Sequence, residues 1–484
     1  MEEIQLPFLQ AIRRQQNTGR IPLHMPGHKQ GRSIIPPLQP VLGAAALYDY
    51  TELPFTDDLS QPLGALKESQ AMLAELYGAD ASFYLVNGTS GGIMATIFAL
   101  SAAGKKVLLM RNSHRSVSQG LILSGATPVY MATTWDKQTG VALPPTVDDI
   151  RHALETHPDI AMVILTSPSF HGLSGHLEEQ IKLIHEYDIP VMVDEAHGVH
   201  THFSPLLPKD ALQSGADAVI QSTHKTLSGF TQCSWMHIQG HRVSASRIQA
   251  ALRILQTTSP SYILLLSLEG AMAQMATDGP EKLTRSLELT ARMKEQLNRD
   301  TPLKFLELDE LPLQHVAGQD LGKLYLRTAP FGLSGFQAAN LLRLHGLEPE
   351  LADSGGVLLM LTLADDEEHF IAIEAALREF AKTLDPSAEA FPLLTEAPWA
   401  ALQPNLALTP REAWYSEKEL TPFDQAIGRV CAETITVYPP GVPVLLPGEV
   451  IEVEILDYLM QVKKYGGNIV CDNHTLQTIT VIKE

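Results

Sequence analysis

The chain has little cysteine: only Cys233, Cys431 and Cys471 occur in 484 residues. They are widely spaced and form no metal-ligand cluster, so we expect free thiols in a reducing compartment and no metal site. Long apolar runs are also absent, and none approaches the roughly 20 residues that a membrane span needs. The acidic start, Met1 to Gln5, lacks the basic end and apolar core of a signal peptide. These absences argue against a membrane protein and favour the cytoplasm.

Positive charge is scarce as well. The 35 lysine and arginine residues face 55 acidic residues, which gives a formal net charge of −20 at pH 7. Such a balance argues against nucleic acid and anionic membrane surfaces as partners. The hydrophobic share of 45% and the charged share of 19% are those of a globular protein. At this length we expect two or three domains.

The order of apolar and polar segments predicts an α/β protein with additional domains. Strands and helices alternate in the middle of the chain, which favours a mostly parallel sheet. A helix is expected over residues 208–214 and a long connecting helix over 281–297, with a strand at 305–308. The expected divisions are an N-terminal arm (1–60), a large domain (61–275), a smaller α+β domain (276–384), a linker rich in proline and alanine (385–410) and a C-terminal module (411–484).

Lys225 ends the segment Ala218-Val219-Ile220-Gln221-Ser222-Thr223-His224-Lys225. A short apolar strand there leads into a polar, hydroxyl-rich turn that presents one lysine. Burial or a nearby cation lowers the pKa of such a lysine and frees its amine to form a Schiff base. Ser222 and His224 can hold a phosphate beside it. The alternative is an ordinary surface lysine.

A carboxylate follows a second apolar strand, in Val191-Met192-Val193-Asp194-Glu195-Ala196-His197. Because an open parallel sheet binds ligands at the carboxyl ends of its strands, Asp194 and Lys225 are expected to face one crevice. A carboxylate and a Schiff-base lysine together suit pyridoxal phosphate, whose ring nitrogen the carboxylate keeps protonated. The alternatives for Asp194 are a helix cap or a metal ligand. The Asp-Glu-Ala-His run resembles ATPase signatures, but the chain lacks the glycine-rich phosphate loop that those enzymes carry.

A phosphate cradle is expected at Gly88-Thr89-Ser90, where a strand meets a helix. Backbone N–H groups at a helix N-terminus bind phosphate, and the two hydroxyls add donors. Such a turn can also cap an ordinary helix. His114 follows the next strand, at residues 106–110, where it can stack on a cofactor ring or serve a structural role.

These motifs, in this order, resemble fold-type I pyridoxal-phosphate enzymes. The N-terminal Ile21-Pro22-Leu23-His24-Met25-Pro26-Gly27-His28-Lys29 narrows the resemblance to the Orn/Lys/Arg decarboxylase family. Further segments similar to that family are Thr51-Glu52-Leu53-Pro54, Asp57-Asp58-Leu59, Gln256-Thr257-Thr258-Ser259-Pro260 and Tyr438-Pro439-Pro440-Gly441. The resemblance runs from about residue 21 to about residue 448. Ser60 departs from it, because the family often has histidine there.

The resemblance implies decarboxylation of a basic amino acid with pyridoxal 5′-phosphate bound to Lys225. It implies a stacking role for His114 and a proton-donor role for Lys225 or His197. The cofactor-binding set is expected to be Gly88, Thr89, Ser90, His114, Asp194, Ala196, His197, Ser222, His224 and Lys225. In this family the active site lies between two subunits, so a homodimer or higher homo-oligomer is expected, with Thr258 and Ser259 reaching the partner's phosphate.

The substrate is less closely defined. The chain leaves no room for the N-terminal wing domain of larger family members, so it resembles the short biosynthetic form typified by arginine decarboxylases. Lysine and ornithine stay open as substrates. Glu433, Asp57 and Asp58 are candidate acids for the distal cation, and each could instead be a surface acid. Two further alternatives are an aminotransferase or α-oxoamine synthase and a non-catalytic homologue, although Lys225 and Asp194 are both present.

Overall fold

The computed structural model describes residues 4–393, 404–438, 441–473 and 475–483. Its centre is a seven-stranded sheet in the order β1-β10-β9-β8-β6-β2-β3. Five neighbouring strands run parallel, whereas β10 is antiparallel to both β9 and β1. The strands are β1 (Ala81–Leu85), β2 (Lys106–Met110), β3 (Thr127–Met131), β6 (Ile160–Thr166), β8 (Val191–Asp194), β9 (Ala218–Gln221) and β10 (Ser234–Ile238).

Both faces of this sheet are buried. Val163 and Leu165 of β6 pack into one apolar cluster, whereas Met162 and Ile164 pack into another. Successive strand residues point to opposite faces, so two separate cores follow from nearly continuous apolar strands. The surrounding helices are α3 (Ala65–Tyr77), α4 (Gly88–Leu100), α5 (Arg115–Ser124), α6 (Val147–Thr156), α7 (Leu177–Glu186), α8 (Thr223–Thr226), α9 (Ala245–Leu255) and α10 (Tyr262–Met275). This arrangement confirms the predicted α/β fold with a mostly parallel sheet.

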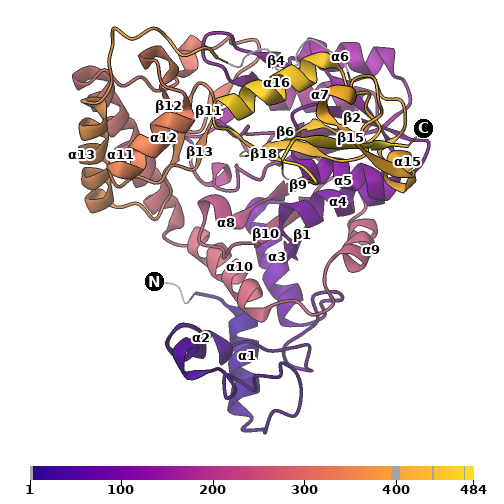
Figure 1. Ribbon diagram of the computed structural model, residues 1–484. Helices are drawn as coiled ribbons and strands as arrows, with labels where there is room; N and C mark the ends of the chain where they lie inside the picture. Colours follow the sequence, from indigo (N-terminus) through magenta and orange to yellow (C-terminus); the bar gives the residue numbers. More distant parts are fainter. Residues whose placement is uncertain (1–3, 394–403, 439–440, 474, 484) are drawn as a thin grey trace.

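The N-terminal arm extends away from the body of the molecule (Figure 1). It contains α1 (Pro7–Asn17) and α2 (Gln39–Ala46). The buried carboxylate of Glu269 in α10 accepts hydrogen bonds from the backbone N–H groups of Phe8 and Leu9, at 2.8 and 2.9 Å. These first N–H groups of α1 have no acceptor within their own helix, so Glu269 caps α1 and ties the arm to the body.

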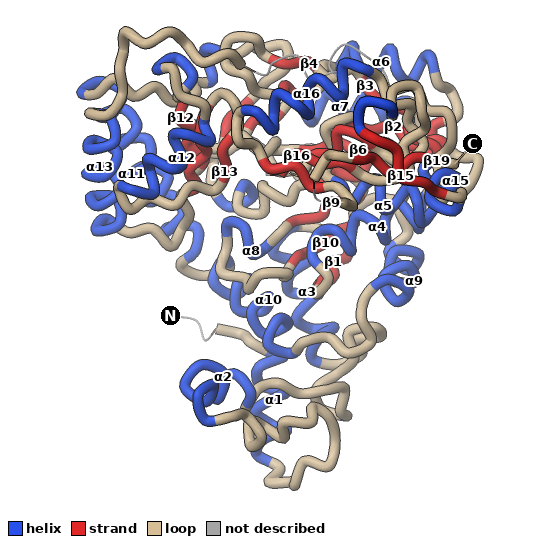
Figure 2. The backbone as a smooth tube through the Cα atoms, viewed as in Figure 1, coloured by secondary structure: helices blue, strands red, loops and turns tan. Residues whose placement is uncertain are grey.

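A second group of elements follows α10 and has its own apolar core. It consists of α11 (Gly279–Asp300), β12 (Lys323–Arg327), α12 (Gly335–Leu344), β13 (Leu351–Ala352), β14 (Gly356–Met360) and α13 (Glu367–Ala381). The strands form an antiparallel sheet in the order β12-β14-β13. Figure 2 shows the helices of this group beside that sheet, with α11 and α13 farthest from the central sheet. Two-stranded pairings link β11 (Gly318–Gln319) to β7 (Leu173–Ser174) and β4 (Thr134–Trp135) to β5 (Ala142–Leu143).

The C-terminal elements have an apolar core of their own. They are α15 (Pro410–Tyr415), β15 (Lys418–Pro422), β16 (Ile435–Tyr438), β17 (Val442–Leu445), α16 (Val453–Lys464), β18 (Asn468–Val470) and β19 (Thr478–Ile482). Arg111, directly after β2, fixes this module to the central sheet. Its guanidinium donates to Glu449 Oε2 at 2.9 Å and to the carbonyls of Pro443 and Val444 at 3.0 and 3.1 Å.

Two predicted elements are wrong. Residues 208–210 are irregular and 211–214 form a turn instead of a helix, because Asp210 closes a single turn with Gln213 and Ser214 and Gly215 then takes a left-handed φ of 96°. Residues 305–308 form one isolated bridge between Phe305 and Leu326, not a strand. Residues 394–403 of the predicted linker lie outside the described part of the chain. None of the helices in the described ranges combines the length and apolar character needed to cross a membrane.

Candidate active site

A cavity of about 460 Å³ lies where β6, β8 and β9 end. The central sheet supplies one side, and residues of the two other apolar groups supply the rest. The lining residues include Gly88, Thr89, Ser90, His114, Asp194, Ala196, His197, Ser222, His224, Lys225, Glu350, Asp353, Val437, Val442 and Tyr458. The structure therefore brings together the ten residues predicted from the Gly-Thr-Ser, His114, Asp194 and Lys225 segments.

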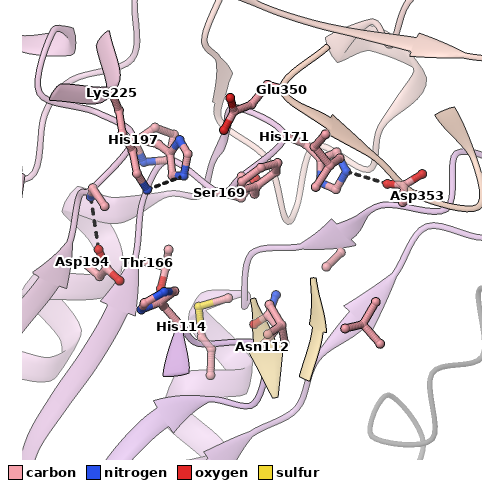
Figure 3. Close-up of a pocket in the computed structure, with 18 of the residues that line it drawn as sticks. Asn112, His114, Thr166, Ser169, His171, Asp194, His197, Lys225, Glu350 and Asp353 are labelled. Atoms are coloured by element: carbon pink, nitrogen blue, oxygen red, sulfur yellow. Dashed lines mark hydrogen bonds and ion pairs between the residues drawn. The ribbon is translucent and has the colours of Figure 1, made fainter. Parts of the chain in front are cut away.

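Lys225 lies in the short helix α8, directly after β9, and its Nζ is 2.9 Å from His197 Nε2. Burial lowers the pKa of the Lys225 amine below its usual value, against the opposing charges of Asp194 and Glu350. Burial lowers the pKa of His197 too, and the charges of Lys323 and Lys225 act in the same direction. Figure 3 shows the two side chains pointing toward each other. A neutral imidazole beside a lysine amine can exchange a proton with it.

Asp194 ends β8 and is only 4% exposed. Its Oδ1 accepts a hydrogen bond from the backbone N–H of Ala196 at 3.2 Å. Burial raises the pKa of this carboxyl, which Lys225 partly offsets. A cationic N–H in the cavity would complete the pairing of Asp194, since a buried carboxylate is stable only with such a partner.

Hydroxyl groups gather at the start of α4. Thr89 Oγ1 lies 2.7 Å from Ser222 Oγ and 2.6 Å from Ser234 Oγ. Ser222 follows β9 and Ser234 begins the antiparallel β10, so both hydroxyls reach the same edge of the sheet. Gly88 begins α4 with a left-handed φ of 70°, and only one atom, Gln232 O at 3.9 Å, would come near an added Cβ. The first N–H groups of α4 also point toward this end of the helix, where an anion is favoured.

His114 caps the N-terminus of α5. Its Nδ1 accepts from the backbone N–H of Ser116 at 3.3 Å, which leaves the proton of the neutral ring on Nε2. Burial, with Lys225 and Arg115 nearby, lowers the pKa of His114 to about 4. The ring is therefore neutral at pH 7, and its position in the cavity lining suits stacking on a flat ligand.

Together these groups fit a phosphate-bearing aromatic aldehyde. The hydroxyls and the α4 N-terminus suit the phosphate, Lys225 suits the aldehyde and Asp194 suits a protonated ring nitrogen. The Cβ-free backbone at Gly88 keeps the approach to the cradle open. The residues of this chain thus match the cofactor that the sequence motifs predict.

The predicted substrate acids lie elsewhere. Glu433 is buried inside the C-terminal module, where its two carboxylate oxygens accept from the backbone N–H groups of Asp472 and Thr480 at 2.7 and 2.6 Å. It is neither a cavity residue nor a surface acid. Asp57 caps the start of α3 through the N–H groups of Gly64 and Leu66, and Asp58 accepts from Ser60 N–H. None of these three acids lines the cavity of this chain.

Thr258 and Ser259 are exposed and also lie outside this cavity. They occupy the loop between α9 and α10.

Sequence reasoning missed the residues that the smaller sheet contributes. Asp353 Oδ2 lies 3.1 Å from His171 Nε2, and its Oδ1 accepts from Tyr325 OH at 2.5 Å and from Gly355 N–H at 2.8 Å. Glu350 lines the same cavity, and no bonding partner for its carboxylate occurs among the described residues. Figure 3 places Glu350 between the Lys225–His197 pair and the His171–Asp353 pair. Neither acid belongs to a recognisable motif, so no local signal singles it out.

Comparison with known proteins gives a consistent result. The family model for the Orn/Lys/Arg decarboxylase major domain matches residues 6–317, and the model for the C-terminal domain of the same family matches residues 393–469. An arginine decarboxylase of Bacillus anthracis is 35% identical over 488 residues, covering 100% of this chain and 98% of its own length. An arginine decarboxylase of Bacillus subtilis strain 168 is 33% identical over 491 residues, covering 100% and 99%.

Solved structures agree on the fold. The constitutive lysine decarboxylase of Escherichia coli superposes with a TM-score of 0.82 at 21% identity, covering 99% of this chain and 82% of that one. A serine palmitoyltransferase of Sphingomonas wittichii superposes with a TM-score of 0.51 at 18% identity, covering 65% and 76%. The family models and the full-length relatives together establish that this chain belongs to the Orn/Lys/Arg decarboxylase family.

Proposed function

We propose that the protein is a pyridoxal-phosphate-dependent decarboxylase that converts arginine to agmatine and carbon dioxide. The observation that carries this proposal is the convergence of Lys225, His197 and Asp194 with the hydroxyl cradle in one cavity. The full-length relatives named for arginine decarboxylation support the substrate. Free cysteines, all three buried, are compatible with a reducing cytoplasm.

Pyridoxal phosphate supplies an electron sink for the pair of electrons left at Cα when the carboxylate departs. Lys225 Nζ would hold the aldehyde group of the cofactor, and the hydroxyls of Thr89 and Ser222 would hold its phosphate. Asp194 keeps the ring nitrogen protonated, because its buried carboxylate favours a cationic partner. His114 would lie against the ring as a neutral imidazole, so it would add no charge that competes with Asp194.

The departing carboxylate leaves a carbon that must take up a proton. Lys225 and His197 are two basic groups in direct contact in the cavity, with 2.9 Å between Nζ and Nε2. We assign the proton transfer to this pair, with Lys225 delivering the proton to Cα and His197 exchanging one with Lys225. Burial lowers the pKa of Lys225 from its usual high value, which makes its proton easier to give up, and it lowers the pKa of His197, which keeps the imidazole neutral.

The distal cation of the substrate needs a carboxylate in the cavity. Among the described lining residues, Asp194 is committed to the ring and Asp353 already accepts from His171, Tyr325 and two backbone N–H groups. Glu350 alone of the three lining acids has no bonding partner there. We therefore assign the distal cation to Glu350, whose two oxygens can accept a planar guanidinium in bidentate fashion.

We infer a homodimer from the surface of the N-terminal arm. Many large apolar side chains of residues 21–63 are exposed in the single chain, including Ile21 at 76%, Leu23 at 90% and Val41 at 72%. An apolar surface of that extent marks an interface. The exposed Thr258 and Ser259 would then serve the partner's phosphate, as the family resemblance implies.

The first experiment combines an absorption spectrum with product analysis. Purified protein should bind pyridoxal phosphate and show a visible band, and arginine should yield agmatine and carbon dioxide. Lys225→Ala should lose that band and its turnover, and Asp194→Ala should keep some cofactor yet lose most activity. Consumption of a keto acid without carbon dioxide release would overturn the decarboxylase proposal. A colourless, inert protein would favour a non-catalytic homologue.

Glu350→Gln tests the substrate assignment. Losing one charged hydrogen-bonding partner costs about 1.5–3 kcal/mol, so KM for arginine should rise about 10-fold to 100-fold. The matched control is Glu348→Gln, because Glu348 is exposed and pairs with Arg343 outside the cavity. An unchanged KM in Glu350→Gln, or cadaverine or putrescine from lysine or ornithine as the main product, would contradict the arginine assignment.

A further inference from the structure

The smaller sheet buries a lysine that the reaction described above does not use. Lys323 is the first residue of β12 and is 2% exposed. Among the described residues, its Nζ donates to the carbonyls of Phe170 and Ser169 alone, at 3.3 and 3.5 Å, which are long contacts for a charged donor. Burying an ammonium with such weak partners is costly. A group kept at that cost is a candidate for a functional role.

A chain of contacts leads from Lys323 to the reacting lysine. Lys323 Nζ lies 6.0 Å from the centroid of the Phe170 ring. That ring meets His197 edge-on, with centroids 4.9 Å apart, and His197 Nε2 lies 2.9 Å from Lys225 Nζ. Since Phe170 and Ser169 also line the cavity, one layer of side chains separates Lys323 from the cavity itself.

We propose that Lys323 is a positioning residue whose buried positive charge holds His197 and the Lys225 nitrogen in their neutral forms. A second cation near a Schiff-base lysine favours its free amine, and Lys323 supplies one from behind Phe170. The proposal rests on the proposed function, because it assigns Lys225 the role given above.

The groups around Lys323 determine how strong its charge is. Asp320 is the nearest counter-charge and is itself paired with His200, with 3.1 Å between Oδ2 and Nε2. Burial lowers the pKa of Lys323 to about 7, which Asp320 opposes, so Lys323 carries its full positive charge below about pH 7. The charge of Lys323 in turn lowers the pKa of His197. The titratable or charged groups that face Lys323 from the neighbouring elements are Asp320, His197, His200, Lys225 and Glu350.

The test is Lys323→Met in the pyridoxal-phosphate-loaded enzyme. Methionine keeps the unbranched shape and removes the charge. The measurement is the pH at which the cofactor absorption band changes, which reports protonation of the Lys225 nitrogen and does not require turnover. The midpoint should rise by about half to one pH unit, the size expected of one charge beyond the first layer of contacts.

Lys294→Met is the matched control. Lys294 is also largely buried and pairs with Glu307 at 2.7 Å, but it lies on α11 and does not line the cavity. Its midpoint should match that of the wild type. If Lys323→Met does not fold, Lys323→Gln, which can still donate to the Ser169 and Phe170 carbonyls, should show the same rise.

Two outcomes separate this inference from the proposed function. A coloured enzyme whose midpoint does not move in either Lys323 variant overturns the role of Lys323 and leaves the decarboxylase proposal intact. A wild-type protein that binds no pyridoxal phosphate overturns both. A midpoint that falls would also refute the inference, because loss of a positive charge cannot favour the neutral nitrogen.

Discussion

Replacing Arg111 by methionine tests how far the C-terminal module depends on one buried ion pair. Arg111 and Glu449 are 4% and 2% exposed, and 2.9 Å separates Nη2 from Oε2. The same guanidinium holds the carbonyls of Pro443 and Val444. The variant would leave the Glu449 carboxylate buried without its cation, and it would free the segment that carries Val442 into the active-site cavity.

The expected loss follows from these contacts. Removing one partner of a buried ion pair costs about 3–5 kcal/mol. Glu449 limits the loss by taking up a proton, because burial already raises its pKa. We therefore expect the free energy of unfolding of Arg111→Met to fall by about 3–5 kcal/mol. Turnover should fall as well, since the cavity loses the wall that Val442 supplies.

Urea unfolding followed by circular dichroism measures this loss, and limited proteolysis shows whether the C-terminal module is cut first. The double variant Arg111→Met/Glu449→Leu should recover much of the stability, because it removes both buried charges. The control is Arg378→Met, whose ion pairs with Glu374 and Asp300 are partly exposed and should contribute about 1 kcal/mol or less. A stability of Arg111→Met within about 1 kcal/mol of the wild type would refute the reasoning.

Two further changes test the core of the fold. His237 is fully buried, and burial lowers its pKa to about 3. Below about pH 6.5 the unfolded chain therefore binds a proton at this residue that the folded chain does not bind. The free energy of unfolding should decrease as the pH is lowered, by about 2 kcal/mol from this residue at pH 5. Between pH 7 and pH 5, thermal unfolding of His237→Gln should show a smaller loss of stability than the wild type, whereas His369→Gln should behave like the wild type. An equal dependence of stability on pH in the wild type and both variants would contradict this. Gly335→Ala places a Cβ 1.8 Å from the backbone oxygen of Gly356, so it should destabilise the protein by at least about 1–3 kcal/mol in urea unfolding. An unchanged unfolding midpoint would contradict this, because it would show that β14 can move away from the added Cβ at little cost.

The sequence predicts those site residues that a short segment of neighbouring residues is enough to identify. Lys225 and Asp194 each follow a short apolar strand, and the rule that parallel strands present their carboxyl ends together is enough to place them in one cavity. The strands at β2 and β9 have the predicted bounds because their apolar runs end abruptly in polar residues. The helix expected at 208–214 fails because side-chain bonds from Asp210 close one turn and Gly215 ends it.

Other parts depend on contacts that no local pattern records. Glu350 and Glu348 look alike in the sequence, yet one lines the cavity and the other pairs with Arg343. Glu433 is a plausible substrate acid in the sequence, but its hydrogen-bond donors, the N–H groups of Asp472 and Thr480, lie 39 and 47 residues farther along the chain. No local pattern indicates that they occupy its carboxylate. Lys323 is likewise unremarkable as a residue, and only the folded chain places it behind Phe170.

The antiparallel strand β10 has a consequence for the order in which the protein matures. Within the central sheet, β1 pairs only with β10, and Ala81 lies opposite Ile238. During synthesis, about 150 more residues must therefore be added after the phosphate cradle before β1, the strand that precedes it, can pair with β10. Pyridoxal phosphate cannot meet a complete cradle on a nascent chain shorter than this, so cofactor loading belongs to the end of folding of the large sheet and cannot guide its beginning.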